Sequence, residues 1–344
     1  MTRASRLILA NEEGQTVHNQ LELFGLDSCL AMVRGNRELP DSVKSARERQ
    51  LLAAHRVLTE STIDEVSFLH AGLCQTSLPH SKPSADNEPW QRTNGRFHMV
   101  VEPGTIIDPV SGKSKWVGVP HGTRARLIML YLNRHGTRDR RIHLGSSMTN
   151  WMDRLGIQAT GGKNGSIRAV KEQSVRLGRA RFSLQFENPE TGALGISDTQ
   201  LADHLHLWVT DSDSPWIEEI ELTQKFHDHL KEHAVPLSDG AISYLSGSSL
   251  KLDLYAWAAW RLPRLEKSLR LNWAQIAATF SAAGETNKVA AKVREALVAV
   301  ASVYREMKID VTRHGLVLHP SNPPVPRTLV QVGGKQGTLF SSRK

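Results

Sequence analysis

Six cationic or hydrogen-bonding side chains surround a glycine-rich turn near the middle of the chain. They are Lys163, Asn164, Ser166, Arg168, Lys171 and Arg176. An arginine can donate two hydrogen bonds to the O6 and N7 atoms of guanine, whereas a lysine more often contacts phosphate. Residues of these types in this order therefore indicate contact with a DNA groove.

The elements that would position these side chains are predicted from the apolar spacing. Residues 146–156 are typical of a short helix that ends at a glycine, and Gly161 and Gly162 form a turn. A longer helix follows, capped by Ser166 or Asn164, with four inward residues at helical spacing: Ile167, Val170, Ser174 and Leu177. Its far side carries Arg168, Glu172 and Arg176. This arrangement predicts a helix-turn-helix, whose second helix lies in the major groove.

The formal net charge of +8 is concentrated in one block of the chain. Between His121 and Arg181 there are thirteen Lys or Arg and three Asp or Glu, so this block carries +10 and the remainder −2. Such a block is typical of a protein that binds a polyanion, and nucleic acid is the expected one. A solvated basic face is the alternative, but coincidence with the helix-turn-helix pattern favours DNA.

The composition limits the class of protein. With 344 residues, 40% of them apolar, the chain can form two or three domains with substantial cores. Cys29 and Cys74 are too few for a zinc site or a disulfide scaffold, so we expect a reduced cytoplasm, no metal and no cofactor. We also expect no membrane partner, because no apolar run could span a bilayer and the N-terminus lacks a signal-peptide pattern.

The order of predicted elements indicates an α+β fold with two winged-helix domains in tandem. The first domain is predicted at 93–212, where 97–101 and 115–119 are expected to pair as strands. A helix at 123–133, a strand at 141–144, the helix-turn-helix and a hairpin complete the order of a winged helix.

A second copy is predicted at 213–320, about 120 residues further along. Asn272-Trp273 echoes Asn150-Trp151, and the helix starting at Asn287 carries Lys288, Lys292 and Arg294 as its DNA-contacting residues. A single α+β domain without a repeat is the alternative.

The two ends of the chain are predicted to differ from these domains. Residues 1–92 form a partly flexible N-terminal region that ends in a linker rich in Pro and Ser, and 321–344 form a flexible tail.

The stretch from Phe97 to Phe186 resembles the plasmid-encoded RepA-type replication initiators of Gram-negative bacteria. The resembling motifs are the runs 119–126, 144–147, 155–157, 160–162, 165–168 and 173–177. The resemblance implies tandem winged helices that bind direct repeats, called iterons, in double-stranded DNA at a plasmid origin. It also implies opening of the adjacent duplex, recruitment of the host helicase-loading machinery, and a monomer in equilibrium with a homodimer that represses its own gene.

A short peptide near the N-terminus resembles the bacterial sliding-clamp-binding motif. It comprises Gln20, Leu21, Glu22, Leu23 and Phe24. Such a peptide docks as an extended segment, with the Gln side chain hydrogen-bonded and the Leu-Phe pair in an apolar pocket. The alternative is an amphipathic turn that packs on its own domain, and 336–340 is a weaker second match.

Three other functions remain open, and we expect no enzymatic activity. A transcriptional repressor would bind a palindromic operator through the same helices, and a structural nucleoid protein would show no sequence preference. A nicking endonuclease would need His204 and His206 for a metal ion and Tyr304 as the nucleophile. The run 112–114 lacks the earlier glycine of a phosphate-binding loop, which argues against an ATPase.

Overall fold

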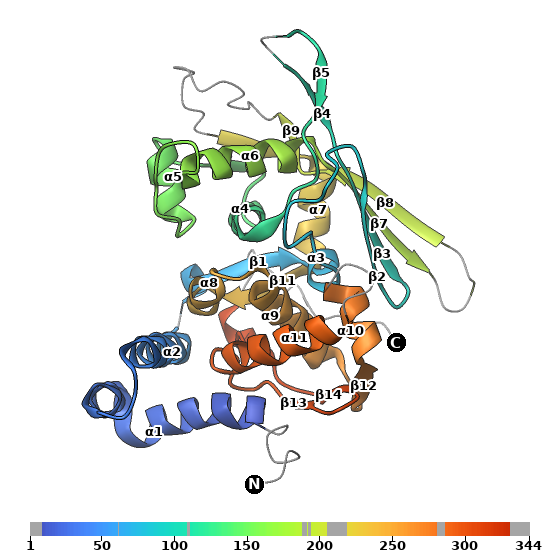
Figure 1. The fold of residues 1–344 in the computed structure, drawn as a ribbon. Coiled ribbons are helices and arrows are strands. Elements are labelled where there is room, and N and C mark those ends of the chain that lie inside the picture. The colour runs from blue at the N-terminus through green and yellow to red at the C-terminus, as the bar shows by residue number, and fades with distance from the viewer. Residues whose placement is uncertain are drawn as a thin grey trace. The chain divides into compact units, whose positions relative to one another are not determined.

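The chain folds into an α+β protein with several small antiparallel sheets. The computed structural model describes residues 9–60, 62–108, 111–187, 191, 194–204, 219–280 and 286–330. These residues form two compact units (Figure 1). The terminal unit contains the described residues up to Ser67 together with those from Val235 onward, and the central unit is Phe68–Ala234.

The N-terminal residues of the terminal unit form two helices with a shared core. Helix α1 (Leu9–Gly35) is bent at Gly25, where φ is +73°, and packs against α2 (Asp41–Thr59) and α11 (Thr286–Ala301). Buried Val17, Leu21, Cys29, Leu30, Leu51 and Ala54 form the core between α1 and α2. A 3-10 turn, Ile63–Glu65, leads into β1 (Val66–His70), within which the chain leaves this unit.

The C-terminal residues of the same unit contain the second predicted module. The chain returns at β11 (Ala234–Ser238) and continues through α8 (Asp239–Leu245), α9 (Ser249–Arg261) and a 3-10 turn, Leu262–Arg264. The module then adds β12 (Leu269–Asn272), α10 (Trp273–Phe280), α11, β13 (Ile309–Val311) and β14 (Gly315–Leu318). The strands are ordered β12-β14-β13, and a final 3-10 turn is Arg327–Leu329.

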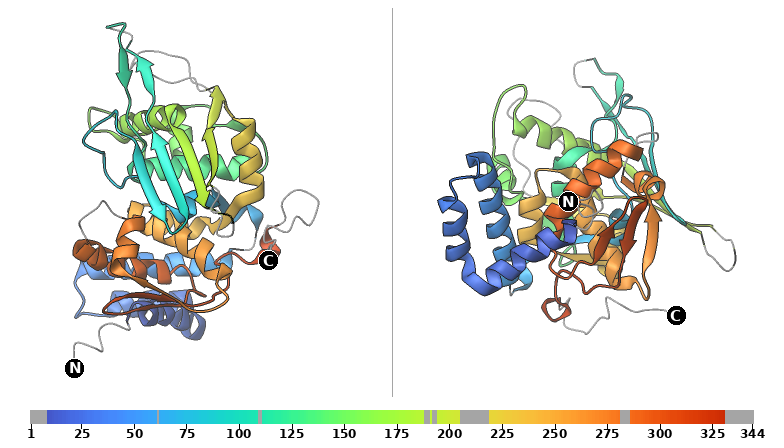
Figure 2. Two further views of the ribbon diagram at one scale, coloured as in Figure 1. Left: turned by 90° about the vertical axis from the view of Figure 1, so that its right-hand side faces the viewer. Right: turned by 60° about the horizontal axis from the view of Figure 1, so that its bottom comes forward.

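The central unit is built on a four-stranded antiparallel sheet. After α3 (Ala71–Gln75), its strands are β2 (Trp90–Asn94), β3 (Phe97–Glu102), β7 (Arg181–Glu187) and β8 (Leu194–Gln200), in the order β2-β3-β7-β8. A separate hairpin, β4 (Thr105–Ile107) with β5 (Ser114–Trp116), projects beyond the rest of this unit (Figures 1 and 2).

The helices of the central unit carry the predicted helix-turn-helix. They are α4 (Gly122–Gly136), α5 (Met148–Arg154), α6 (Ser166–Arg179) and α7 (Gln224–His233). A second sheet has the order β6-β10-β9, formed by β6 (Arg141–His143), β10 (Glu219–Leu222) and β9 (Ala202–His204). Helix α4 packs against both α6 and α7. Among the described helices, none is long and apolar enough to cross a membrane.

The predicted order of elements is present, but the pairing of 97–101 with 115–119 is wrong. Strand β3 pairs with β2 and β7, and not with residues 115–119, whose strand β5 pairs with β4. Strand β6 pairs with β10 and not with the β7–β8 hairpin. Strand β10 and α7 therefore belong to the central unit and not to the second module, because β10 lies between two central strands.

The boundaries of the two units also differ from the predicted domain boundaries at 92 and 212. The predicted N-terminal region 1–92 is shared between the units, since α1 packs against α11 and α2 against α8, while α3 and β2 belong to the central unit. The predicted linker is packed against its own unit: Trp90 Nε1 donates to the carbonyl oxygen of Ser77 at 2.8 Å, and Asn94 Nδ2 to that of Gln75 at 2.9 Å. Of the predicted flexible tail 321–344, residues 321–330 are described and include buried Val325 and a 3-10 turn, whereas the part from 331 onward lies outside the described residues.

Candidate nucleic-acid interface

Helix α5 ends at the predicted glycine and begins two residues later than predicted. The Ser147 hydroxyl accepts a hydrogen bond from the Asn150 amide at 3.1 Å and so caps the first turn. At the other end, Gly156 adopts φ +68°, and the Ile157 amide donates to the Met152 carbonyl at 2.9 Å. This is a Schellman termination, which stops the helix and directs the chain into the turn.

Two hydroxyl side chains brace the turn before α6. The Ser166 hydroxyl donates to the Gln158 carbonyl at 2.6 Å and accepts from the Thr160 amide at 2.8 Å, while the Ser166 amide donates to Thr160 Oγ1 at 2.9 Å. Gly165 is the N-cap residue of α6, where a Cβ would overlap the carbonyl oxygens of Thr160 and Gly161. Neither Ser166 nor Asn164 caps the helix, contrary to prediction. Ser166 is buried and committed to the turn, so we remove it from the DNA-contacting set.

Three of the four predicted inward residues of α6 are buried and Ile167 is half-buried, while the N-terminal half of the helix leaves polar side chains in solvent. Val170 and Leu177 are fully buried, and Ser174 is buried beside them. Lys163, Asn164 and Arg168 are exposed, and Lys171 is half-buried. The Arg168 guanidinium donates to the Lys163 carbonyl at 3.4 Å, which holds its side chain near the entrance of the helix. These four side chains are therefore accessible from solvent in the folded protein.

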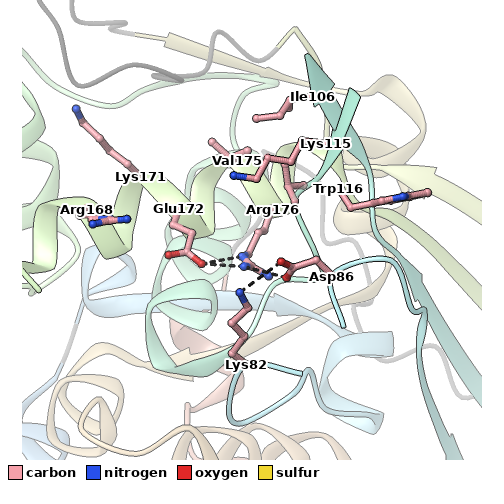
Figure 3. A pocket seen from close by; sticks show the side chains of 11 residues that line it. Lys82, Asp86, Ile106, Lys115, Trp116, Arg168, Lys171, Glu172, Val175 and Arg176 are labelled. Carbon is pink, nitrogen blue, oxygen red and sulfur yellow. Dashed lines mark hydrogen bonds and ion pairs between the residues drawn. The ribbon is translucent and has the colours of Figure 1, made fainter. Parts of the chain in front are cut away.

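Arg176 lies inside the protein, contrary to prediction. Its side chain is 4% exposed and is paired with Glu172 at 2.8 Å and with Asp86 at 3.4 Å (Figure 3). It also donates to the Val119 carbonyl at 3.2 Å. The four-residue spacing correctly places Arg176 on the same stripe as Arg168, but other segments of the central unit cover the C-terminal end of that stripe. Arg176 therefore anchors those segments to α6, and this role is not visible from helical spacing alone.

The motifs that resemble RepA proteins mostly supply similar anchors. The buried Arg126 guanidinium donates to the carbonyl oxygens of Leu78, Pro79 and Gly122 at 2.7, 3.2 and 2.8 Å. Gln173 accepts from the His121 amide at 2.9 Å, and burial lowers the pKa of the His121 imidazole. Sequence reasoning missed Gln173 and Thr160 as structural residues. The sequence does contain a signal for each: Gln173 is a polar residue on the apolar side of a helix, and Thr160 is a hydroxyl residue at a glycine turn.

The second module presents its predicted residues on α11. Lys288 and Lys292 are exposed and four residues apart, so they share one face of the helix. The Arg294 guanidinium lies 4.4 Å from the centre of the Trp273 ring, a cation–π contact that fixes it on α10. The predicted echo with Asn150-Trp151 is out of register, because Asn272 caps α10 through the Gln275 amide at 2.9 Å, whereas Asn150 lies inside α5.

The predicted clamp-binding peptide is part of helix α1. Leu21 is buried in the core against α2, while Gln20 is exposed and Leu23 and Phe24 are 75% and 51% exposed. The bend at Gly25 follows directly. The pair predicted to anchor the peptide is therefore free of the core, but docking in an extended form requires the last turn before Gly25 to unwind. The weaker match at 336–340 lies outside the described residues.

The residues required for nicking are not assembled in the described part of the chain. The Tyr304 hydroxyl donates to the Asn322 carbonyl at 2.7 Å, and the side chain is buried, which raises the pKa of its phenol well above the usual value. Desolvation is the main cause. His204 ends β9, and His206 lies outside the described residues. No group of described His, Cys, Asp or Glu side chains is arranged to hold a metal ion.

Comparison with known proteins identifies the family of the segment that carries this site. Residues 119–281 match the family described as plasmid encoded RepA protein. This match includes the predicted helix-turn-helix and confirms the resemblance seen in the sequence. No curated protein matches the chain. Among solved structures, the crystal structure of the RctB domains 2-3 is 12% identical, covers 69% of this chain and 83% of its own, and superposes with a TM-score of 0.39.

Proposed function

We propose that this protein initiates plasmid replication by binding direct repeats in origin DNA. The observation that carries the proposal is the exposed cationic edge of α6, formed by Lys163, Arg168 and Lys171 on a braced turn within the RepA-family segment. Backbone phosphates supply most of the attraction for such an edge, and Arg168 is the side chain suited to read a guanine.

We further propose that each unit contains one winged helix. The order of helix, strand, helix, helix, strand and strand occurs from α4 to β8 and again from α9 to β14. In the second module β12 and β13 flank β14 in one sheet, as the strands of a wing would. Helix α6 would then enter one major groove with Lys163, Asn164, Arg168 and Lys171, and α11 another with Lys288 and Lys292. Arg294 would support α11 through its stack on Trp273.

The remaining parts of the proposal concern activity and partners. We propose a binding protein without nuclease or ATPase activity, which acts in the bacterial cytoplasm and recruits the host sliding clamp and helicase-loading machinery. A monomer that binds repeats and a dimer that represses transcription would both use the same helices. Supercoiled origin DNA incubated with the protein and Mg²⁺ should stay unnicked, and a nicked product lost in Tyr304→Phe would refute this part.

Footprinting on the DNA that flanks the protein's own gene tests the central proposal. Protection of tandem direct repeats is the expected result, and protection of a lone palindrome would favour the repressor. Affinity should fall as salt rises, with a slope of roughly −0.9 in log K against log salt for each phosphate contacted. Lys163→Ala should weaken binding to the repeat and to random DNA alike. Binding that ignores both sequence and salt would refute the proposal.

A further inference from the structure

A groove of about 480 Å³ runs between α6 and the β4–β5 hairpin, within the central unit (Figure 3). The described residues that line it come from these two elements, from Val117 after the hairpin and from the segment before β2. No described residue of β7 or β8, the strands that follow α6 in the chain, lines the groove. The element that flanks the exposed edge of α6 is therefore a hairpin that precedes α4 in the chain.

The base of this hairpin is fixed on the last turn of α6. Arg179 Nε donates to the Thr105 carbonyl at 3.0 Å, and the Val117 amide donates to the Gly104 carbonyl at 3.1 Å. Gly104 lies so close to α6 that a Cβ there would overlap the Arg179 carbonyl oxygen. The base of the hairpin is thus held on α6, so side chains from both elements can contact one partner together.

Lys115 lies on the face of the hairpin that is turned toward α6. Lys115 and its cross-strand partner Ile106 both line the groove. Figure 3 shows the Lys115 side chain directed toward α6 and the Trp116 side chain pointing away from it. This is the alternation expected of successive residues in a strand. The hairpin therefore presents a cation, and not an aromatic ring, to the groove.

The charges in the groove leave it cationic. The lining contains five Lys or Arg and two carboxylates, so its net charge is +3. Arg176 is paired with Glu172 and Asp86, and Lys82 with Asp86 at 3.4 Å, so both carboxylates already have cationic partners. The cations that line the groove without a carboxylate partner in the described part of the chain are Lys115 from β5, and Arg168 and Lys171 from α6.

We propose that one sugar–phosphate backbone of duplex DNA lies in this groove, between Lys171 of α6 and Lys115 of the hairpin. Lys115 and Arg168 are exposed and Lys171 is half-buried, which suits a ligand that stays hydrated on its outer side, as a DNA backbone does. Arg168 remains free to reach a base in the adjoining major groove. The β4–β5 hairpin thus takes the place beside the recognition helix that the order of elements gives to β7–β8.

The inference rests on the proposed function, because it extends the duplex contact of α6 to a second element. Phosphate contacts fix the position of a protein on the duplex but carry no sequence information. The hairpin contact therefore acts on repeat and random DNA alike, whereas the proposed function requires a preference for repeats. The two can be tested separately on the same protein.

The first experiment measures salt dependence by fluorescence anisotropy, with the full-length protein on a labelled duplex repeat and on a random duplex of the same length. Lys115→Ala should lower the slope of log K against log salt by about 0.9 on both duplexes, because one phosphate contact is lost. Lys231→Ala is the charge-matched control, since Lys231 is exposed on α7 in the same unit and does not line the groove. It should leave both slopes unchanged.

The second experiment locates the hairpin on the DNA. Both native cysteines are buried, so a thiol-reactive iron–EDTA group should label an introduced cysteine preferentially. Labelled Lys115→Cys should cleave the backbone within each bound repeat, and labelled Lys231→Cys should not cleave at those positions. Absence of cleavage by labelled Lys115→Cys on a duplex that it still binds would place the hairpin away from the DNA.

The outcomes distinguish the inference from the proposed function. If the wild type prefers repeats and Lys115→Ala has the same salt slope as Lys231→Ala, the inference is wrong and the proposed function stands. If Lys115→Ala lowers the slope but the wild type binds repeat and random duplex equally, the hairpin contact stands and the proposed function fails. A wild type that binds neither duplex overturns both.

Discussion

Replacing Arg176 with Ala should destabilise the central unit by about 2–4 kcal/mol and leave the DNA affinity of the folded protein unchanged. Breaking a fully buried ion pair costs about 3–5 kcal/mol. Glu172 and Asp86 are 46% and 36% exposed and can recover water, which lowers that cost. The Val119 carbonyl loses its charged donor, which adds about 1–3 kcal/mol. The range of 2–4 kcal/mol allows for both effects.

Arg168→Ala is the matched comparison on the same helix and should behave in the opposite way. Its side chain is exposed, so stability should change by no more than about 0.5 kcal/mol. Affinity for the repeat should fall by about 1–3 kcal/mol if Arg168 reads a base. Arg176→Lys should give intermediate stability, because a lysine keeps the charge but not the planar fork that meets several acceptors.

Urea unfolding followed by circular dichroism measures the stability of each variant, and anisotropy titration with repeat DNA measures affinity under conditions where all variants are folded. The reasoning is refuted if Arg176→Ala is as stable as the wild type and loses DNA affinity. The guanidinium would then face the groove of DNA, as helical spacing alone suggests, and the segment containing Asp86 would not cover it.

Three further predictions test other parts of the structure. Gly118→Ala should destabilise the protein more than Gly112→Ala does. Both glycines have positive φ, but only at Gly118 would a Cβ overlap the Arg176–Asp86 ion pair. Equal urea midpoints for the two variants would contradict this packing. Burial, with some repulsion from neighbouring histidines, lowers the pKa of His70 to about 3. The neutral ring is thus the folded form: its contribution is complete above pH 6.5 and is lost toward pH 3, at about 1.4 kcal/mol per pH unit. His70→Asn should reduce the dependence of the urea midpoint on pH, while the Asn side chain can still accept the hydrogen bond from the Gly72 amide. Changing Leu23 and Phe24 to Ala should abolish binding to purified sliding clamp and leave repeat binding intact, because both side chains are exposed. If the double variant still binds the clamp, the peptide at 336–340 is the clamp-binding motif.

Local structure around the helix-turn-helix was predictable from the sequence because short-range interactions determine it. The Gly156 stop of α5 depends on neighbours within a few residues. The inward face of α6 follows from helical periodicity, which Val170 and Leu177 obey. The order of elements from α4 to β8 and from α9 to β14 follows from the same kinds of signal.

Features that depend on residues distant in the chain were not predictable in this way. One partner of β3 is β7, some eighty residues later, and an alternating strand does not specify which other strand it meets. Helix α1 packs against α11 and α2 against α8, so helices from opposite ends of the chain share one unit. Periodicity reports that a face is apolar, but it does not identify what covers it.

The residues of the candidate site also differ in whether local sequence or distant contacts determine their surroundings. Residue type and helical spacing predicted that Lys163, Arg168 and Lys171 are available to a polyanion, and the structure leaves Lys163 and Arg168 exposed and Lys171 half-buried. Only the tertiary structure decided that Arg176 is an anchor, because Asp86 and the Val119 carbonyl reach it from segments 90 and 57 residues away. The same folding brings the β4–β5 hairpin beside α6. A charged side chain on a helix is free or buried according to what packs over it, and that depends on contacts that no local pattern encodes.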